Sequence, residues 1–117
     1  MDLVAFIGDD KENWGQVTGL INRGEWGKIF LIKNQNANTF PYHSKAELIS
    51  VDSSKKLLEL KKEISDKIKG KFSEFDAHLS IASGNGKEHM ALISALLSLP
   101  VGIRLVAFTK NGVEMIN

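Results

Sequence analysis

The chain has 117 residues, a formal net charge of +1 and no cysteine. This length suits one domain, so we expect residues 1–117 to share a single core. The nearly balanced charge excludes a global field that would attract duplex nucleic acid or an acidic membrane. The lack of cysteine excludes disulfides, thiolate metal sites and a cysteine nucleophile.

Neither a signal peptide nor a membrane span is predicted. The first residues include an acid, Asp2, and run directly into an apolar stretch without a basic region and a cleavage site. The longest apolar stretch, residues 91–103, is interrupted by Ser94, Ser98 and Pro100 and is too short to cross a bilayer. We therefore expect a cytoplasmic protein.

The first half of the chain alternates between apolar runs and helical patterns. Residues 3–7 are a continuous apolar run, which is typical of a strand covered on both faces. Apolar residues then recur at helical spacing from Trp14 to Ile21, and Gly24 is placed to end this helix. Further strands are predicted over residues 28–32 and 47–51, separated by an irregular stretch over residues 34–44.

A second helix is predicted from an apolar stripe that Leu57, Leu60, Ile64 and Ile68 form at spacings of three and four. Its opposite face pairs unlike charges four residues apart, which favours a solvated surface over a nucleic-acid contact. These pairs are Lys62–Asp66 and Glu63–Lys67. Before the helix, Asp52, Ser53 and Ser54 offer N-cap oxygens, and Gly70 ends it.

The second half predicts a fourth strand over residues 77–82, a Gly-rich turn, and a helix over residues 87–99. This helix is apolar nearly all round, so it should be buried on more than one side. We therefore expect a homodimer through helix 87–99, with Leu92 facing outward. A fifth strand is predicted over residues 103–108, and Asn111-Gly112 predicts a hairpin into an antiparallel sixth strand over residues 113–116.

Strands that alternate with helices predict an α/β fold, here a Rossmann-like, mainly parallel six-stranded sheet with a C-terminal antiparallel β-hairpin at one edge. The doubly wound order 3-2-1-4-5 places strands one and four side by side, and ligands bind beyond the carboxyl ends of the strands where the order reverses. The ligand-binding crevice is therefore predicted between two loops. The residues concerned are Gly8, Asp9, Asp10 and Asn13 in the first loop, and Ser83, Gly84, Asn85, Gly86 and Lys87 in the second.

The second loop has the composition of an anion site. Its glycines remove the Cβ atoms that would keep a phosphate from the backbone N–H groups, and the following helix directs its positive end at the same place. Lys87 lies in the first helical turn, where a nearby anion would offset its charge. The alternative is a Gly-rich connection with a solvated lysine.

Two classes of bound group are not expected at this loop. His89 stands where a dinucleotide fingerprint has its third glycine, and the glycine spacing does not fit a phosphate-binding Walker A loop, so we expect no cofactor. The three histidines show no ligand spacing with one another, so no metal site is predicted.

The segment Ser83-Gly84-Asn85-Gly86-Lys87 resembles the Thr-Gly-Gly-Thr-Lys-like signature that follows strand four in the CRISPR-associated Rossmann-fold (CARF) sensor family. The match lies in the hydroxyl, the first glycine and the lysine. A terminal antiparallel hairpin is part of the same resemblance, which covers nearly the whole chain. Asn85 and Gly86 depart from the signature, and Asp9 and Asp10 stand where the family often has a hydroxyl or an amide.

The resemblance implies a homodimer that binds cyclic oligoadenylate, a nucleotide second messenger, or another phosphate-bearing ligand across its two-fold axis. The chain would act either as a sensor or as a metal-independent ring nuclease. In the second case a ribose 2′-hydroxyl attacks the neighbouring phosphate, Lys87 stabilises the developing charge, and His89 is the candidate general base.

Two other hypotheses remain open. A phospho-acceptor receiver domain would use Asp9, Asp10, Asp52, Ser83 and Lys110, with Mg²⁺ held by the acids. Receivers continue into a helix after that lysine, whereas Lys110 enters the predicted hairpin. The other hypothesis is a small binding module for an ordinary nucleotide, which the same crevice residues would serve.

Overall fold

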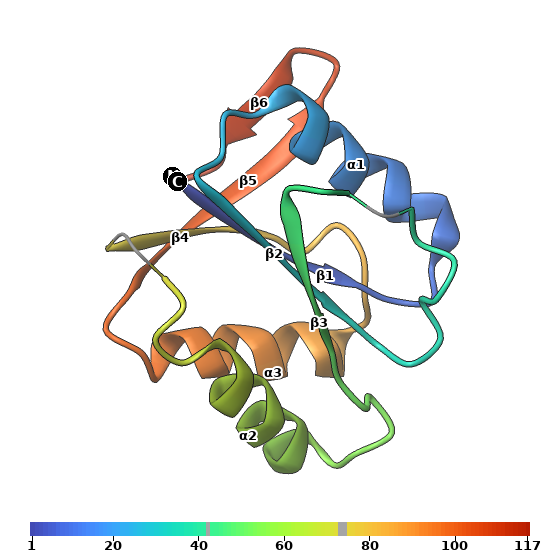
Figure 1. Cartoon of the computed structure of the whole chain (residues 1–117), viewed down its shortest axis with the longest axis vertical. Helices are drawn as coiled ribbons and strands as arrows, with labels where there is room; N and C mark the ends of the chain where they lie inside the picture. The colour runs from blue at the N-terminus through green and yellow to red at the C-terminus, as the bar shows by residue number, and fades with distance from the viewer. Residues whose placement is uncertain (42, 73–74) are drawn as a thin grey trace.

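The computed structural model describes residues 1–41, 43–72 and 75–117. Figure 1 shows a twisted sheet with α1 on one face and α2 and α3 on the other. The strands are β1 (Asp2–Ile7), β2 (Lys28–Lys33), β3 (Ala46–Ser50), β4 (Asp76–Ser80), β5 (Gly102–Thr109) and β6 (Gly112–Met115). The helices are α1 (Trp14–Arg23), α2 (Leu57–Ile68) and α3 (Gly86–Leu97), and a short 3-10 turn, η1 (Lys11–Asn13), precedes α1.

The sheet has the order β3-β2-β1-β4-β5-β6. Its first five strands pair in parallel, and β6 runs antiparallel to β5. The predicted α/β class, the order 3-2-1-4-5 and the antiparallel edge are therefore confirmed. The order reverses between β1 and β4, which places the carboxyl ends of these two strands next to each other.

The central strand β1 explains why the first apolar run is continuous. All six of its residues are buried, because helices cover both faces of the sheet at this place. Leu3, Ala5 and Ile7 pack in the cluster that includes α1. Val4 and Phe6 pack in the cluster that includes α2 and α3.

The N-cap predicted for α2 is wrong. The helix begins at Leu57, and its N-cap is Lys56, whose side chain makes no capping hydrogen bond. Asp52 instead accepts hydrogen bonds from the amide and the hydroxyl of Ser54. This local turn ends before the helix starts, so the oxygens of residues 52–54 do not reach the first-turn amides.

The predicted C-terminal hairpin is confirmed, with its turn one residue earlier than expected. Thr109 pairs with Gly112, so Lys110 and Asn111 are the turn residues. Gly112 follows with φ +98°, whereas no described residue other than glycine has a positive φ. The glycine therefore supplies the left-handed conformation after the turn, rather than within it.

Helix α3 is buried on the side that faces the sheet and α2. Leu92 is completely buried there, so the expectation that it faces outward is wrong. The exposed apolar side chains of α3 are Met90 and Leu97, which are 58% and 70% exposed.

Among the described residues, no helix combines the length and the apolar character that a membrane span requires.

Candidate functional site

The loops that leave β1 and β4 touch at the point where the strand order reverses. A Cβ atom placed on Gly8 would lie only 2.7 Å from the Cα of Gly84, so the two backbones are in direct contact. The Gly8 amide donates a 2.9 Å hydrogen bond to the Ser83 hydroxyl, across 75 positions of sequence. Gly8, Ser83 and Gly84 thus join the two loops at the place where the crevice was predicted.

The carboxylate of Asp10 binds the Gly-rich loop directly. Its Oδ1 accepts hydrogen bonds from the Ser83 hydroxyl at 2.7 Å and from the Gly84 amide at 3.0 Å. Its Oδ2 accepts a 2.7 Å bond from the side-chain amide of Asn13. Burial raises the pKa of Asp10, but the hydrogen bonds from Asn13, Ser83 and Gly84 outweigh it and hold the pKa below its ordinary value. Asp10 is therefore ionised at neutral pH.

The start of α3 is closed by a capping box. The Asn85 side chain accepts a 2.9 Å bond from the Glu88 amide, and the Glu88 carboxylate accepts a 2.9 Å bond from the Asn85 amide. Asn85 is thus a helix cap in addition to being a predicted binding residue. The amides of Gly86 and Lys87 remain without a hydrogen bond inside the described chain, as the first amides of a helix commonly do.

Glu88 connects the segments that follow β2 and β3 to the start of α3. Its side chain is 1% exposed, and its Oε2 accepts bonds from the side-chain amide of Asn34 at 2.9 Å and from the hydroxyl of Ser53 at 2.5 Å. The same Asn34 nitrogen donates to Asp9 at 2.6 Å. Sequence reasoning missed this group. The Asn85-x-x-Glu88 spacing is a signal for the cap, whereas nothing in the sequence places Asn34 or Ser53 beside Glu88.

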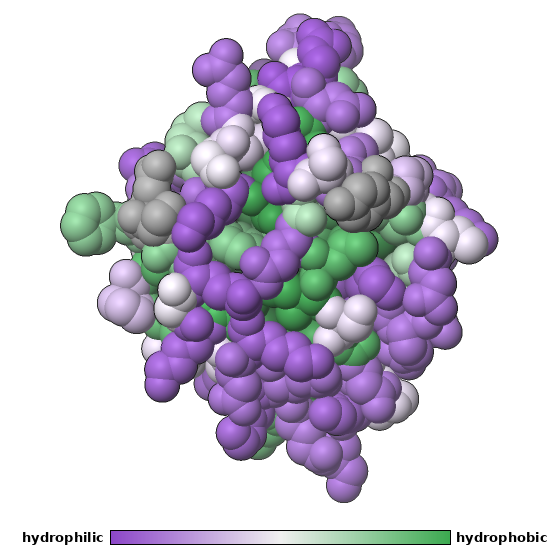
Figure 2. All heavy atoms as spheres, viewed as in Figure 1, coloured by the Kyte–Doolittle hydropathy of each residue, from purple (hydrophilic) through white to green (hydrophobic). Residues whose placement is uncertain are grey.

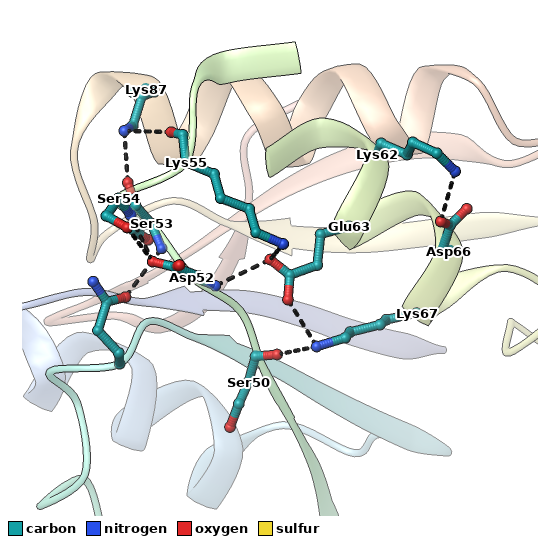
Figure 3. A network of polar contacts seen from close by, with 11 residues as sticks. Ser50, Asp52, Ser53, Ser54, Lys55, Lys62, Glu63, Asp66, Lys67 and Lys87 are labelled. Carbon is teal, nitrogen blue, oxygen red and sulfur yellow. Dashed lines mark hydrogen bonds and ion pairs between the residues drawn. The ribbon is translucent and has the colours of Figure 1, made fainter. Parts of the chain in front are cut away.

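Lys87 points toward the segment before α2, as Figure 3 shows. Its ammonium group donates to the backbone oxygens of Ser53 at 2.6 Å and of Lys55 at 2.9 Å. The Lys55 ammonium in turn pairs with Glu63 at 3.2 Å, and Glu63 pairs with Lys67 at 2.9 Å. Lys87 therefore lies on the α2 side of the crevice and does not contact Asp10.

The outer face of α2 carries the ion pairs that its charge pattern predicts. Glu63–Lys67 and Lys62–Asp66 both have N–O distances of 2.9 Å. Burial raises the pKa of Glu63, but hydrogen bonds from Lys67, from the Asp52 amide and from Lys55 bring it below its ordinary value. These contacts hold the segment before α2 against the helix that follows it.

His89 contacts the backbone of the Gly-rich loop itself. Its Nε2 is 2.7 Å from the backbone oxygen of Ser83. A carbonyl oxygen only accepts hydrogen bonds, so this ring nitrogen carries the hydrogen and donates it. Lys87 and His89 therefore contact backbone oxygens of two different segments. The structure does not bring these two candidate catalytic groups to one point.

Of the residues named for a receiver domain, Asp10 and Ser83 are bonded to each other, but Asp52 and Lys110 make contacts elsewhere. Asp52 binds Ser54, whose side-chain and backbone hydrogen bonds lower the pKa of Asp52 below its ordinary value. Lys110 lies at the hairpin tip, beside a hollow that Gln16 and Arg23 also line. Within residues 1–41, 43–72 and 75–117, no group of three histidines or acids is arranged to hold a metal ion.

Four hollows in the described surface lie away from the two crevice loops. One of about 370 Å³ lies at the start of β2 and β3, and one of about 550 Å³ lies at the ends of α2 and α3. The others lie between α1 and the hairpin and on the outer face of α2. Figure 2 shows that hydrophilic side chains surround an apolar central area on the face that β3 and α2 share.

Comparison of the sequence with protein-family models finds no match, and comparison with curated proteins finds none either.

Proposed function

We propose that the chain binds a phosphate-bearing nucleotide of the cyclic oligoadenylate class at the carboxyl edge of its sheet, above β1 and β4. The contact between Gly8 and Gly84 carries this proposal. It joins the two loops at the point where the strand order reverses, which is where open α/β sheets bind their ligands. The resemblance of residues 83–87 to the CARF signature supplies the ligand class.

The start of α3 adds donors for such a ligand next to Ser83 and Gly84. The Gly86 and Lys87 amides have no partner within the described chain, and they lie at the positive end of the helix dipole. Gly86 has open space where a Cβ would be, so a phosphate oxygen is able to approach the backbone closely. Lys87 lies in the same turn and would add its charge by leaving the Ser53 and Lys55 oxygens.

The arrangement favours binding over cleavage. Ring cleavage requires a group that accepts the 2′-hydroxyl proton and a cation beside the same phosphate. Here the His89 ring is bonded to the Ser83 carbonyl, whereas the Lys87 ammonium is bonded to Ser53 and Lys55. We therefore propose a sensor-type binding domain, with cleavage as an outcome that the experiment below would detect.

A homodimer through α3 is part of the proposal. Met90, Ile93 and Leu97 recur at helical spacing, and the first and last of them are 58% and 70% exposed. A second copy would cover this stripe and would bring two Gly-rich loops together across a two-fold axis. A ring-shaped ligand with repeated phosphates suits such a pair of identical sites.

Isothermal titration of the protein with cyclic tetraadenylate and cyclic hexaadenylate, each with and without Mg²⁺, tests the proposal. We expect one ring to bind per two chains, independently of Mg²⁺, and chromatography of the incubated ligand to return it intact. Binding that requires Mg²⁺ would favour a receiver-like acid site. No binding of either ring, together with binding of a linear mononucleotide, would favour the ordinary nucleotide module.

A further inference from the structure

We infer that Asp10 is an intramolecular competitor for the anion position of the Gly-rich loop, so that a ligand phosphate binds there by displacing this carboxylate. The inference rests on the proposed function and concerns the regulation of the same site. It is carried by the hydrogen bonds that Asp10 makes to Ser83 and Gly84.

The carboxylate takes the donors that a phosphate would use. A Gly-rich loop binds an anion through backbone amides and hydroxyl groups that converge on one place. In this chain, the Ser83 hydroxyl and the Gly84 amide converge on Oδ1 of Asp10 at 2.7 and 3.0 Å. Gly84 has φ +106°, a conformation that glycine adopts readily. An anion from the same chain thus already occupies these donors.

The neighbouring acid has a different role, which makes the assignment to Asp10 specific. Asp9 accepts bonds from the side-chain amides of Asn34 at 2.6 Å and Asn36 at 3.3 Å, and among the described contacts it makes no hydrogen bond to the Gly-rich loop. Both acids carry the same charge in the same loop. A general repulsion of phosphate would therefore involve both, whereas competition for the donors involves Asp10 alone.

Displacement of Asp10 would also be transmitted along the chain. Its Oδ2 holds Asn13 at 2.7 Å, and Asn13 is the last residue of η1 and directly precedes α1. The backbone of the same turn depends on Asp10, because the Asn13 amide donates to the Asp10 carbonyl at 2.9 Å. A phosphate that takes Ser83 and Gly84 would free Oδ1, so the turn before α1 would lose its link through Asp10 to the Gly-rich loop.

The test compares Asp10→Asn with Asp9→Asn, which removes the same charge one residue away. Inorganic phosphate is the probe, and the amide signals of Gly84 and Lys87 in ¹H–¹⁵N spectra report its binding. Because a hydrogen bond to a charged group is stronger than one to a neutral group, we expect Asp10→Asn to bind phosphate about 5–30-fold more tightly than the wild type. Asp9→Asn should change the affinity much less.

Equal gains in the two variants would overturn the inference, because they would indicate general repulsion. The absence of a phosphate-induced shift at Gly84 in Asp10→Asn would overturn it as well. If Asp10→Asn does not fold, Asp10→Ser provides the same comparison, since it removes the carboxylate and keeps a short polar side chain.

Titration with cyclic tetraadenylate separates this inference from the proposed function. Equal affinity of the wild type and Asp10→Asn for the ring would refute competition by Asp10 and would leave the proposed function intact. Tight phosphate binding by Asp10→Asn, without binding of cyclic oligoadenylates by either protein, would refute the ligand class and would support the competitor role of Asp10.

Discussion

The buried carboxylate of Glu88 accepts a 2.9 Å hydrogen bond from the side-chain amide of Asn34, and this contact ties the start of α3 to the end of β2. Ser53 and the Asn85 amide donate to the same carboxylate, so it receives three donors and offers none. The side chain at position 88 must therefore accept hydrogen bonds at both of its terminal atoms.

Glu88→Gln should therefore destabilise the fold, although it changes the shape of the side chain little. One oxygen becomes an NH₂ group, which would face a donor and leave buried hydrogen-bonding groups unpaired. We expect a loss of about 1–3 kcal/mol in the free energy of unfolding, measured with urea. Glu59→Gln on the exposed side of α2 is the control and should change little. Equal effects of the two changes would contradict this role of Glu88.

Gly8→Ala should separate the two crevice loops, because the new methyl group would lie 2.7 Å from the Cα of Gly84. We expect a destabilisation of about 1–3 kcal/mol, as for other cases of overpacking. Gly15→Ala in α1 is the matched control, since a Cβ there meets nothing within 4 Å. It should stabilise the protein by up to about 1 kcal/mol, because alanine favours a helix more than glycine does. Thermal unfolding of the two variants with opposite shifts would confirm both expectations.

The lowered pKa of Asp10 predicts a specific loss of stability in acid. At a pH between the pKa of Asp10 in the folded protein and its pKa in the unfolded chain, the unfolded chain binds more protons. The stability that ionised Asp10 contributes is therefore complete above the unfolded pKa of about 3.9. This stability is lost as the pH falls through the pKa of Asp10 in the folded protein. Asp10→Asn should thus be less stable than the wild type at about pH 6, and the difference should shrink toward about pH 2. A difference that is constant across this range would show that the charge of Asp10 plays no part.

Lys87→Met should loosen the segment before α2, because it removes the donor to the Ser53 and Lys55 oxygens. Faster hydrogen exchange at residues 53–57 would report this change. If the proposed function holds, the affinity for cyclic tetraadenylate should also fall by roughly ten- to a hundred-fold, the worth of a charge-assisted hydrogen bond. Lys45→Met, at an exposed lysine in the hollow beside β2 and β3, is the control for lost charge. An unchanged affinity in Lys87→Met would exclude the lysine from the site.

The proposed dimer predicts that Leu97→Glu yields a monomer with an intact fold. Leu97 is 70% exposed at the end of α3, so the change should not disturb the core of one chain. Light scattering at several protein concentrations measures the mass. Leu58→Glu is the control, because Leu58 is 76% exposed on α2 and lies outside the proposed interface. A wild-type protein that is monomeric at all concentrations would refute the dimer.

The fold was predictable because its main signals are local in sequence. Neighbouring residues in the sequence are enough to identify three of them: the apolar run at residues 3–7, the apolar stripe from Leu57 to Ile68 and the turn near Asn111. The pairing of β1 with β4 then followed from general rules of α/β topology. The positions of the two crevice loops were predictable for the same reason.

The directions of the polar side chains in the crevice were not predictable. Lys87 has four rotatable bonds, and its acceptors Ser53 and Lys55 lie 34 and 32 residues away in sequence. Asn34 belongs to an irregular segment whose path no pattern fixes. Asp10 was expected beside the Gly-rich loop, but the sequence does not tell whether it repels a ligand there or binds the loop itself.

The order of the strands has a consequence for synthesis on the ribosome. β1 emerges first and lies at the centre of the sheet, yet its neighbour on one side, β4, begins only at Asp76. Until β4 has left the exit tunnel, one edge of the most apolar strand has no partner, and the contact between Gly8 and Ser83 must wait for 75 further residues. Such late, non-local pairing slows folding and prolongs the exposure of an unpaired strand edge, which is prone to aggregate. The nascent chain is therefore most vulnerable to aggregation before β4 has emerged.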